Sequence, residues 1–192
     1  DIGAGTGAFA FTMQQNGWKT TALEPDNTAV EVALLKYKLA LQPLENLQQL
    51  PNKEFNAITL WHVLEHVHDV QAYFKKFGEL LATNGTLFIA VPNYTSFDAD
   101  WFKEFWAAYD VPRHLYHFSP TSMQHLAEKH GFSIVKQKRM WFDSFYVSML
   151  STQYQSKKIN YLIAILVGVC STVASIFHKE KCSSLIYILQ KK

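Results

Sequence analysis

A glycine-rich turn at positions 1–7, with the letters DIGAGTG, is the densest chemical signal in the chain. Glycine lets the backbone turn tightly and lets a ligand approach the amide groups, and the N-terminus of a following helix favours an anion. Read as Gly3-x-Gly5-x-x-Ala8, the same letters also satisfy the pattern of dinucleotide-binding proteins. Glu24, at the end of the next predicted strand, suits the hydroxyl groups of a ribose in either case. The turn therefore predicts a site for a nucleotide-like cofactor.

The letters HVLEH, from His62 to His66, match the HxxEH motif of one class of zinc peptidases. Such a zinc site needs both histidines on one face of a helix, together with a further ligand. His62 instead ends residues 55–62, an apolar run with the length of a buried strand. We therefore expect no metal site, and a zinc peptidase is the remote alternative.

A further cluster of ionisable side chains follows the strand predicted at residues 86–91. It consists of Asp110, Arg113, His114 and His117, in a loop rich in aromatic residues, namely Trp101, Phe102, Phe105, Trp106 and Tyr109. Ligands bind beyond the carboxyl ends of the strands in α/β sheets, and histidine is the natural base near neutral pH. We expect His66, His114 and His117, with Arg113, as candidate catalytic residues, and the aromatic side chains around an acceptor pocket. The alternative is that Asp110 and Arg113 pair only to hold the loop.

Strand patterns alternate with helix patterns along the chain, which predicts a parallel sheet covered by helices on both faces. Strands are predicted at 20–24, 41–44, 55–62, 86–91, 132–140 and 183–190, and helices at 8–16, 27–39, 70–81 and 119–131. Asn27 and Ser119 are the expected N-caps, and Asn84-Gly85 should end the third helix. The expected fold is a doubly wound, mostly parallel, seven-stranded sheet with an antiparallel last strand. A buried central strand should run into Asp1, so we expect the first strand to be truncated.

We expect a core formed by residues 1–140 and 182–192, with a helical insertion or cover at 141–181. Within it, residues 159–177 carry no charge and have the length of a membrane span. A single span cannot join two antiparallel neighbouring strands, and small or polar residues recur three and four positions apart from Gly168 to Ser175. We therefore expect a helix packed on the domain or on a second subunit, with a helix in the plane of a membrane as the alternative.

The composition is that of one globular domain with a single core, since 48% of the 192 residues are apolar. The formal net charge is +2 and no dense run of lysine or arginine is present, so we expect no nucleic-acid partner. Two cysteines, Cys170 and Cys182, are too few for a disulfide framework, which is typical of the cytoplasm. The opening letters do not resemble a signal peptide.

Several segments in register are similar to one family. They are DIGAGTG at 1–7, EPD at 24–26, LP at 50–51, WHVLEHVHD at 61–69, VPN at 91–93, FWAAYDVPRHLYHFSP at 105–120 and HGF at 130–132. Together they resemble the class I S-adenosylmethionine-dependent methyltransferases of the ubiquinone-biosynthesis-like group, in particular bacterial members that accompany surface-polysaccharide genes. The resemblance covers nearly the whole chain. It implies a Rossmann-like fold with S-adenosylmethionine as cofactor and S-adenosylhomocysteine as product.

The resemblance assigns the methionine end of the cofactor to the glycine turn and to the end of the strand at 55–62. Gly3, Gly5 and Gly7 form the turn whose amides hold the carboxylate, and Asp1 attracts the amino group. Trp61 and His62 line the same end of the cofactor.

The resemblance assigns the nucleoside end of the cofactor to three residues. Glu24 accepts both ribose hydroxyls in a bidentate pair. Asn46 stands where the family commonly has an acidic residue near the adenine amine, so its oxygen would accept that hydrogen bond without a charge. Leu47 offers a backbone amide and an apolar surface.

The expected function is O-methylation of a small molecule or of a saccharide or lipid-linked intermediate. Two alternatives stay open: an NAD(P)-dependent oxidoreductase with the same glycine pattern, and a non-catalytic binding module. We expect a cytoplasmic protein with a small-molecule acceptor, in contact with a membrane or with a second copy through residues 159–177.

Overall fold

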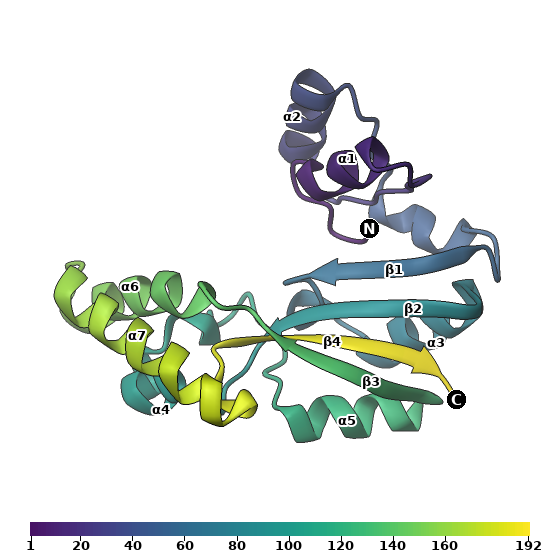
Figure 1. Ribbon diagram of the computed structural model, residues 1–192. Coiled ribbons are helices and arrows are strands. Elements are labelled where there is room, and N and C mark those ends of the chain that lie inside the picture. Colours follow the sequence, from purple (N-terminus) through teal and green to yellow (C-terminus); the bar gives the residue numbers. More distant parts are fainter.

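A computed structural model describes residues 1–192 and contains one mixed sheet with helices around it (Figure 1). The strands are β1 (Phe55–Trp61), β2 (Leu81–Pro92), β3 (Phe132–Arg139) and β4 (Ser184–Lys191), in the order β1-β2-β4-β3. β1 pairs with β2 in parallel, whereas β4 is antiparallel to both of its neighbours. The prediction of an antiparallel last strand is therefore confirmed.

The sheet has four strands, so the prediction of seven is wrong. Three further segments each contribute one bridging residue beyond β1: Ile2 bridges Leu60 and Leu23, and Leu23 bridges Gln42, all in parallel. Each of these pairings consists of a single bridge, so none of the three segments forms a ladder. The strands expected at 20–24 and 41–44 are therefore isolated bridges.

Helices lie on both faces of the sheet (Figure 1). α3 (Val70–Leu80) and α5 (Pro120–Lys129) cover one face, where their apolar side chains join the main core with alternate residues of the strands. α1 (Ala8–Gln15) covers part of the other face, and the ring of Phe9 meets Trp61 edge-on at 5.2 Å between centroids. α2 (Asn27–Tyr37) packs beside α1. Short 3-10 helices fill the connections: η1 (Leu44–Gln49), η2 (Leu64–His66), η3 (Lys103–Phe105), η4 (Ala107–Tyr109) and η5 (Lys179–Lys181).

Capping side chains explain where two helices begin. Ser119 caps α5, and its capping box with Ser122 confirms the prediction from the Ser-Pro pair. α2 begins at Asn27, but its cap is Asp26, whose carboxylate accepts a hydrogen bond from the amide of Thr28. Asn27 as the cap was therefore wrong by one residue, because aspartate fulfils the same role equally well.

The predicted end of the third helix is also wrong. α3 ends at Leu80 and β2 begins with the next residue, so Gly85 lies inside the strand. A Cβ atom at Gly85 would come within 2.8 Å of the backbone oxygen of Phe55, beside an irregularity in the β1–β2 pairing. This glycine therefore allows a close approach of two strands rather than a helix end.

A helical layer lies beyond the carboxyl ends of β1 and β2 (Figure 1). It contains α4 (Phe97–Phe102), α6 (Asp143–Ser156) and α7 (Tyr161–Phe177), and it has its own core, which includes Phe102, Trp106, Val147 and Val167. None of the helices combines the length and the apolar content that a membrane span requires.

A buried carboxylate joins this layer to the sheet. Asp98 of α4 accepts hydrogen bonds from Ser171 Oγ at 2.8 Å, from Ser183 Oγ at 2.7 Å and from Trp106 Nε1 at 2.7 Å. Burial raises the pKa of Asp98, although these hydrogen bonds oppose the rise. Because Ser171 lies on α7 and Ser183 directly precedes β4, Asp98 fixes α7 against the core.

Candidate active site

A cleft of about 570 Å³ lies at the carboxyl end of β1, beside the glycine turn. Four parts of the chain form its walls. They contribute Gly3 from the turn, Glu24 and Pro25 from the next segment, Leu44 and Gln48 from η1, and Trp61, His62, Val63, His66, Val67, His68, Asp69, Ala72 and Tyr73 from the last residue of β1 and the region after it. Because ligands bind outside the carboxyl ends of parallel strands, this cleft is the candidate cofactor site.

The three glycines of the turn differ in the space around them. Gly3 has φ +68°, and a Cβ atom there would lie 2.4 Å from Cγ2 of Val63. Gly7 has φ +78°, and its Cβ atom would lie 3.0 Å from Cδ2 of Leu39. Gly5 has φ +54°, but its Cβ atom would meet nothing within 4 Å. The turn is therefore packed tightly at Gly3 and Gly7 and borders open space at Gly5.

Glu24 is buried and closes the turn from the side of the next segment. Its Oε2 accepts a hydrogen bond from the amide of Gly5 at 2.7 Å, and its Oε1 accepts one from the amide of Asp26 at 3.0 Å. Each carboxylate oxygen has a second acceptor site, so Glu24 retains capacity for two hydroxyl groups. The amide of Gly5 already has an acceptor, whereas that of Gly3 has none within the protein.

Two other expected cofactor residues, Asn46 and Leu47, lie in η1 but not in the cleft wall. Leu47 is in the hydrophobic core, and the side chain of Asn46 contacts that of Gln42 at 3.5 Å. Leu44 and Gln48, on either side of them, line the cleft instead. Residues of the same short helix line the cleft, but the phase of a 3-10 turn decides which of its side chains face it.

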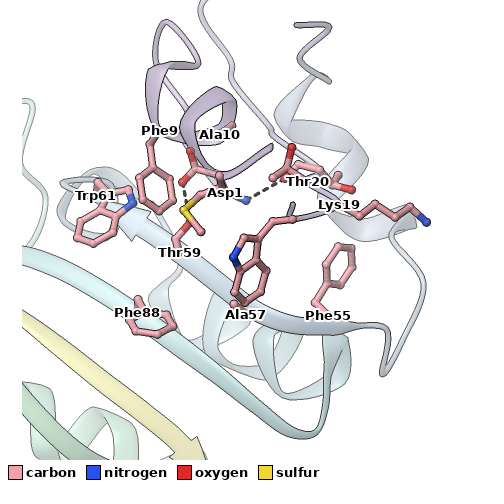
Figure 2. A pocket seen from close by; sticks show the side chains of 13 residues that line it. Asp1, Phe9, Ala10, Lys19, Thr20, Phe55, Ala57, Thr59, Trp61 and Phe88 are labelled. Atoms are coloured by element: carbon pink, nitrogen blue, oxygen red, sulfur yellow. Dashed lines mark hydrogen bonds between the residues drawn. The ribbon is translucent and has the colours of Figure 1, made fainter. Parts of the chain in front are cut away.

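A cavity of about 300 Å³ lies next to α1, on the face of β1 and β2 that is opposite to α3 and α5 (Figure 2). Figure 2 shows aromatic rings around it, from Phe9, Phe55, Trp61 and Phe88. Asp1 lines this cavity rather than the cleft, and its Oδ1 accepts a hydrogen bond from the hydroxyl of Thr59 at 2.7 Å. The cavity shares Trp61 with the cleft, but Gly3, Glu24 and His62 do not line it.

His62 stands between the cleft and a second pocket, since it lines both. Its φ of +55° is rare for a residue with a side chain. Nδ1 of His62 lies 3.4 Å from Oε1 of Glu65, a residue that is 1% exposed and whose carboxylate oxygens have no hydrogen-bond partner. Burial lowers the pKa of His62, but the contact with Glu65 and the charge of Asp143 outweigh burial, so the pKa is raised.

The second pocket has a volume of about 240 Å³ and lies between His62 and the helical layer. α6 contributes Tyr146, Leu150 and Tyr154, which are four residues apart and therefore share one face of that helix. Glu65, Pro92, Ala107, Ala108, Asp110, Arg113, His114, Asp143 and Val147 complete the wall. This pocket borders the cleft at His62 and contains the ionisable side chains of Asp110, Arg113 and His114, so it is the candidate acceptor site.

His114 is the predicted base that lies in this pocket. Its Nδ1 lies 2.8 Å from the backbone oxygen of Ala108, and its Nε2 lies 3.8 Å from Oδ2 of Asp110. Because a carbonyl oxygen can only accept, Nδ1 carries the proton and Nε2 keeps a lone pair. Burial lowers the pKa of His114, which favours this neutral form.

The other predicted catalytic residues have different surroundings. His66 lines the cofactor cleft, and its ring lies 4.6 Å from that of His114 between centroids. Arg113 lines the acceptor pocket, where its Nε and Nη2 donate to Oδ1 of Asp110 at 3.1 and 2.8 Å. His117 lines neither cavity, and its Nε2 lies 2.9 Å from the backbone oxygen of Tyr109.

The five aromatic residues expected around the acceptor do not line its pocket. Phe102 and Trp106 are buried in the core of the helical layer instead, where Val147 of α6 packs against them. The aromatic wall comes from α6, which lies within the helical insertion expected at 141–181, although the sequence analysis gave no bounds for this helix. The spacing of Tyr146 and Tyr154 indicates that they share one face of it.

The HxxEH letters do not form the zinc-peptidase arrangement. His62 follows β1 directly, whereas Glu65 and His66 lie in the three-residue helix η2, so the two histidines do not share an α-helix. Ligand atoms of Glu65, His66 and His114 lie within 4.8 Å of one another. These residues belong to the wall between the cleft and the acceptor pocket.

Comparison with known families and sequences identifies a consistent group. A family model described as a methyltransferase domain matches residues 1–137. The ubiquinone biosynthesis O-methyltransferase of Xanthomonas campestris pv. campestris is 31% identical over 102 residues, which cover 50% of this chain and 43% of the relative. That of Pelagibacter ubique is 29% identical over 100 residues, covering 50% of this chain and 42% of the relative. The aligned part thus spans less than half the length of these curated relatives.

Solved structures share the fold at low sequence identity. A SAM-dependent methyltransferase from Archaeoglobus fulgidus has a TM-score of 0.65 and 17% identity, covering 100% of this chain and 84% of that one. A phosphoethanolamine N-methyltransferase from Haemonchus contortus, in complex with S-adenosyl-L-methionine, has a TM-score of 0.65 and 14% identity, covering 100% of this chain and 47% of that one. The likeness extends over the helical layer as well as the sheet.

Proposed function

Because the chain belongs to the methyltransferase domain family, we propose that it transfers a methyl group from S-adenosylmethionine to a hydroxyl group of a small or lipid-linked acceptor. The observation that carries this proposal is the pair of cavities that meet at His62. The cleft has the Glu24 carboxylate, which suits the hydroxyl groups of a ribose, and the pocket has His114, whose pKa is lowered by burial. The proposed core that binds the cofactor comprises residues 1–140 and 182–192, and residues 141–181 cover the acceptor.

The cleft fits the cofactor at both ends. The Gly3 amide, free of any acceptor within the protein, suits the methionine carboxylate. Glu24 suits the ribose because its carboxylate lines the cleft and retains acceptor sites. Leu44 and Tyr73 supply apolar surface for the adenine, in the place assigned to Asn46 and Leu47. In this proposal Gly5 acts through Glu24, and Asp1 and Gly7 hold the shape of the turn.

When bound, S-adenosylmethionine supplies a methyl group that is already activated by the positive sulfur. The protein then has to exclude water and to hold the acceptor in line. Two well-oriented reactants gain on the order of 7 to 11 kcal/mol over free ones. The walls from α6 and from His62 serve this positioning, because His62 borders both cavities and α6 lines the pocket for the acceptor.

A hydroxyl acceptor has one proton to lose, and Nε2 of His114 is placed to receive it. The carbonyl oxygen of Ala108 holds the proton on Nδ1, so Nε2 is the basic atom. Asp110 lies 3.8 Å from Nε2 and stabilises the imidazolium that forms. Arg113, fixed by the same aspartate, keeps a free Nη1 for a polar group of the acceptor.

Thermal unfolding with and without S-adenosylhomocysteine tests the proposal. We expect the ligand to raise the melting temperature, and we expect Glu24→Ala to remove the rise. Glu31→Ala, which changes an exposed glutamate of α2, is the matched control and should keep it. A rise with a nicotinamide nucleotide instead would favour the oxidoreductase, and cofactor binding without methyl transfer to any hydroxyl acceptor would favour a binding module.

A further inference from the structure

The two faces of α7 differ in size and in chemistry. Its inner face carries small residues: a Cβ atom at Gly168 would lie 2.6 Å from Cδ1 of Phe145, and Ser171 donates its hydroxyl to Asp98. This face is fixed tightly against α6 and α4. The stripe of small residues seen in the sequence is therefore the packed side of the helix, and the larger residues point away from it.

The outer face of α7 is apolar and exposed. Leu162 is 82% exposed and Phe177 is 77% exposed, and the same face carries Ile165, Leu166, Val173 and Ile176, each about half exposed. These positions repeat three and four residues apart and contain no charge. So many large apolar side chains on one helix are unusual for a surface that meets only water.

Cations flank the outer face at both ends. Lys157 and Lys158 precede α7, and Lys179 and Lys181 follow it. With Glu180 as the only acidic residue, residues 157–181 have a net charge of +3, whereas the whole chain has +2. Lys181 is paired with Asp100 at 2.6 Å, but Lys157, Lys158 and Lys179 are exposed.

We propose that the outer face of α7 docks in the plane of an anionic lipid bilayer. The apolar side chains would enter the boundary between head groups and acyl chains, and the flanking lysines would meet lipid phosphates. The helix does not span, because its 17 residues reach only about 26 Å at 1.5 Å per residue and the hydrocarbon layer is about 30 Å thick. Its inner face is also committed to the protein.

The charges favour a bilayer over a second copy of the chain. In a two-fold dimer through the outer face, antiparallel helices would place Lys157 and Lys158 beside Lys179 of the other copy. Parallel helices would place each lysine beside its own equivalent. Either arrangement brings cations together, and Glu180 alone cannot compensate for them. Anionic head groups satisfy both ends of the helix at once.

Docking has a consequence for the acceptor, which rests on the proposed function. α6 packs along α7 and also carries Tyr146, Leu150 and Tyr154 of the acceptor pocket. A bilayer under α7 therefore lies next to the helix that shapes that pocket. This arrangement suits an acceptor that is anchored in the lipid.

Vesicle flotation with the full chain tests the docking. We expect the protein to float with vesicles of phosphatidylcholine and phosphatidylglycerol, and to float far less with phosphatidylcholine alone. The double variant Ile165→Glu/Leu166→Glu should reduce partitioning on the order of tenfold or more, and so should Lys157→Glu/Lys158→Glu. Leu35→Glu, at a 74% exposed leucine of α2, is the matched control and should float normally.

The melting shift with S-adenosylhomocysteine should be the same in all these variants, which separates docking from the proposed function. It also shows that each variant is folded. The proposal is overturned if the unchanged chain does not float with anionic vesicles, or if both double variants float as the control does. A dimer in light scattering that Ile165→Glu/Leu166→Glu abolishes, without flotation of the unchanged chain, would assign the face to a second copy instead.

Discussion

The glycine turn can require glycine for its backbone conformation or for lack of space, and alanine substitutions at Gly3 and Gly5 distinguish these two reasons. Both residues have a positive φ, so alanine at either position introduces backbone strain of about 1–2 kcal/mol. Only at Gly3 does the new Cβ atom collide, 2.4 Å from Cγ2 of Val63. Val63 is β-branched and has few rotamers with which to evade it, and overpacking of this kind adds about 1–3 kcal/mol.

We therefore expect Gly5→Ala to lower the free energy of unfolding by about 1–2 kcal/mol and Gly3→Ala to lower it by about 2–5 kcal/mol. Urea denaturation measures both values, and the melting temperature should fall by about 2–4 °C for each kcal/mol in a domain of this size. Val63 also lines the cleft, so Gly3→Ala should weaken the binding of S-adenosylhomocysteine in parallel.

Val63→Ala removes both γ-carbons and provides the internal control. In a double-mutant cycle, Gly3→Ala and Val63→Ala should show a coupling energy of about 1–3 kcal/mol, because the collision is absent when both changes are present. Equal losses for Gly3→Ala and Gly5→Ala would refute this reasoning. A coupling energy near zero would show that Val63 does not limit the turn.

Two further predictions concern the helical layer and the base. Asp98→Ala leaves three buried donors without an acceptor and should lower the free energy of unfolding by at least about 3 kcal/mol in urea denaturation. Ser171→Ala removes one of these donors and should lower it by only about 1 kcal/mol. Similar losses in the two variants would show that Asp98 does not join the layers. Because burial lowers the pKa of His114 and the base must be neutral, the rate of methyl transfer should fall on acidification with a midpoint below pH 6.5. His114→Gln should slow the reaction by roughly 10²- to 10⁴-fold. An unchanged pH profile in His114→Gln would exclude His114 as the base.

Local signals determined most of the secondary structure. Ser119 and Pro120 predicted the start of α5 to the residue, and the apolar run at 55–62 predicted β1, because capping and periodicity depend on neighbours in the chain. The same kind of signal overestimated the sheet. The pattern at 20–24 and 41–44 is that of strands, but each segment pairs through single bridges, and the extent of pairing depends on partners elsewhere in the fold.

Motif letters determined the family and indicated the candidate cofactor cleft. DIGAGTG and Glu24 lie together as expected, because a turn and the next strand end are close in any sheet of this type. The sequence motifs did not indicate which cavity each of these residues faces. Asp1 faces the opposite side of β1, and η1 presents Leu44 and Gln48 rather than Asn46 and Leu47.

Only the tertiary structure decided how the acceptor pocket is made and what α7 exposes. His62 and Tyr146 are distant in the sequence, and both line the candidate acceptor pocket because Asp98 and the core of the helical layer hold α6 and α7 beyond the ends of the strands. No local preference encodes such a contact, since it arises from packing between elements rather than within one. The uncharged run at 159–177 likewise predicted a helix, but the packing of Gly168 and Ser171 determined which of its faces remains free.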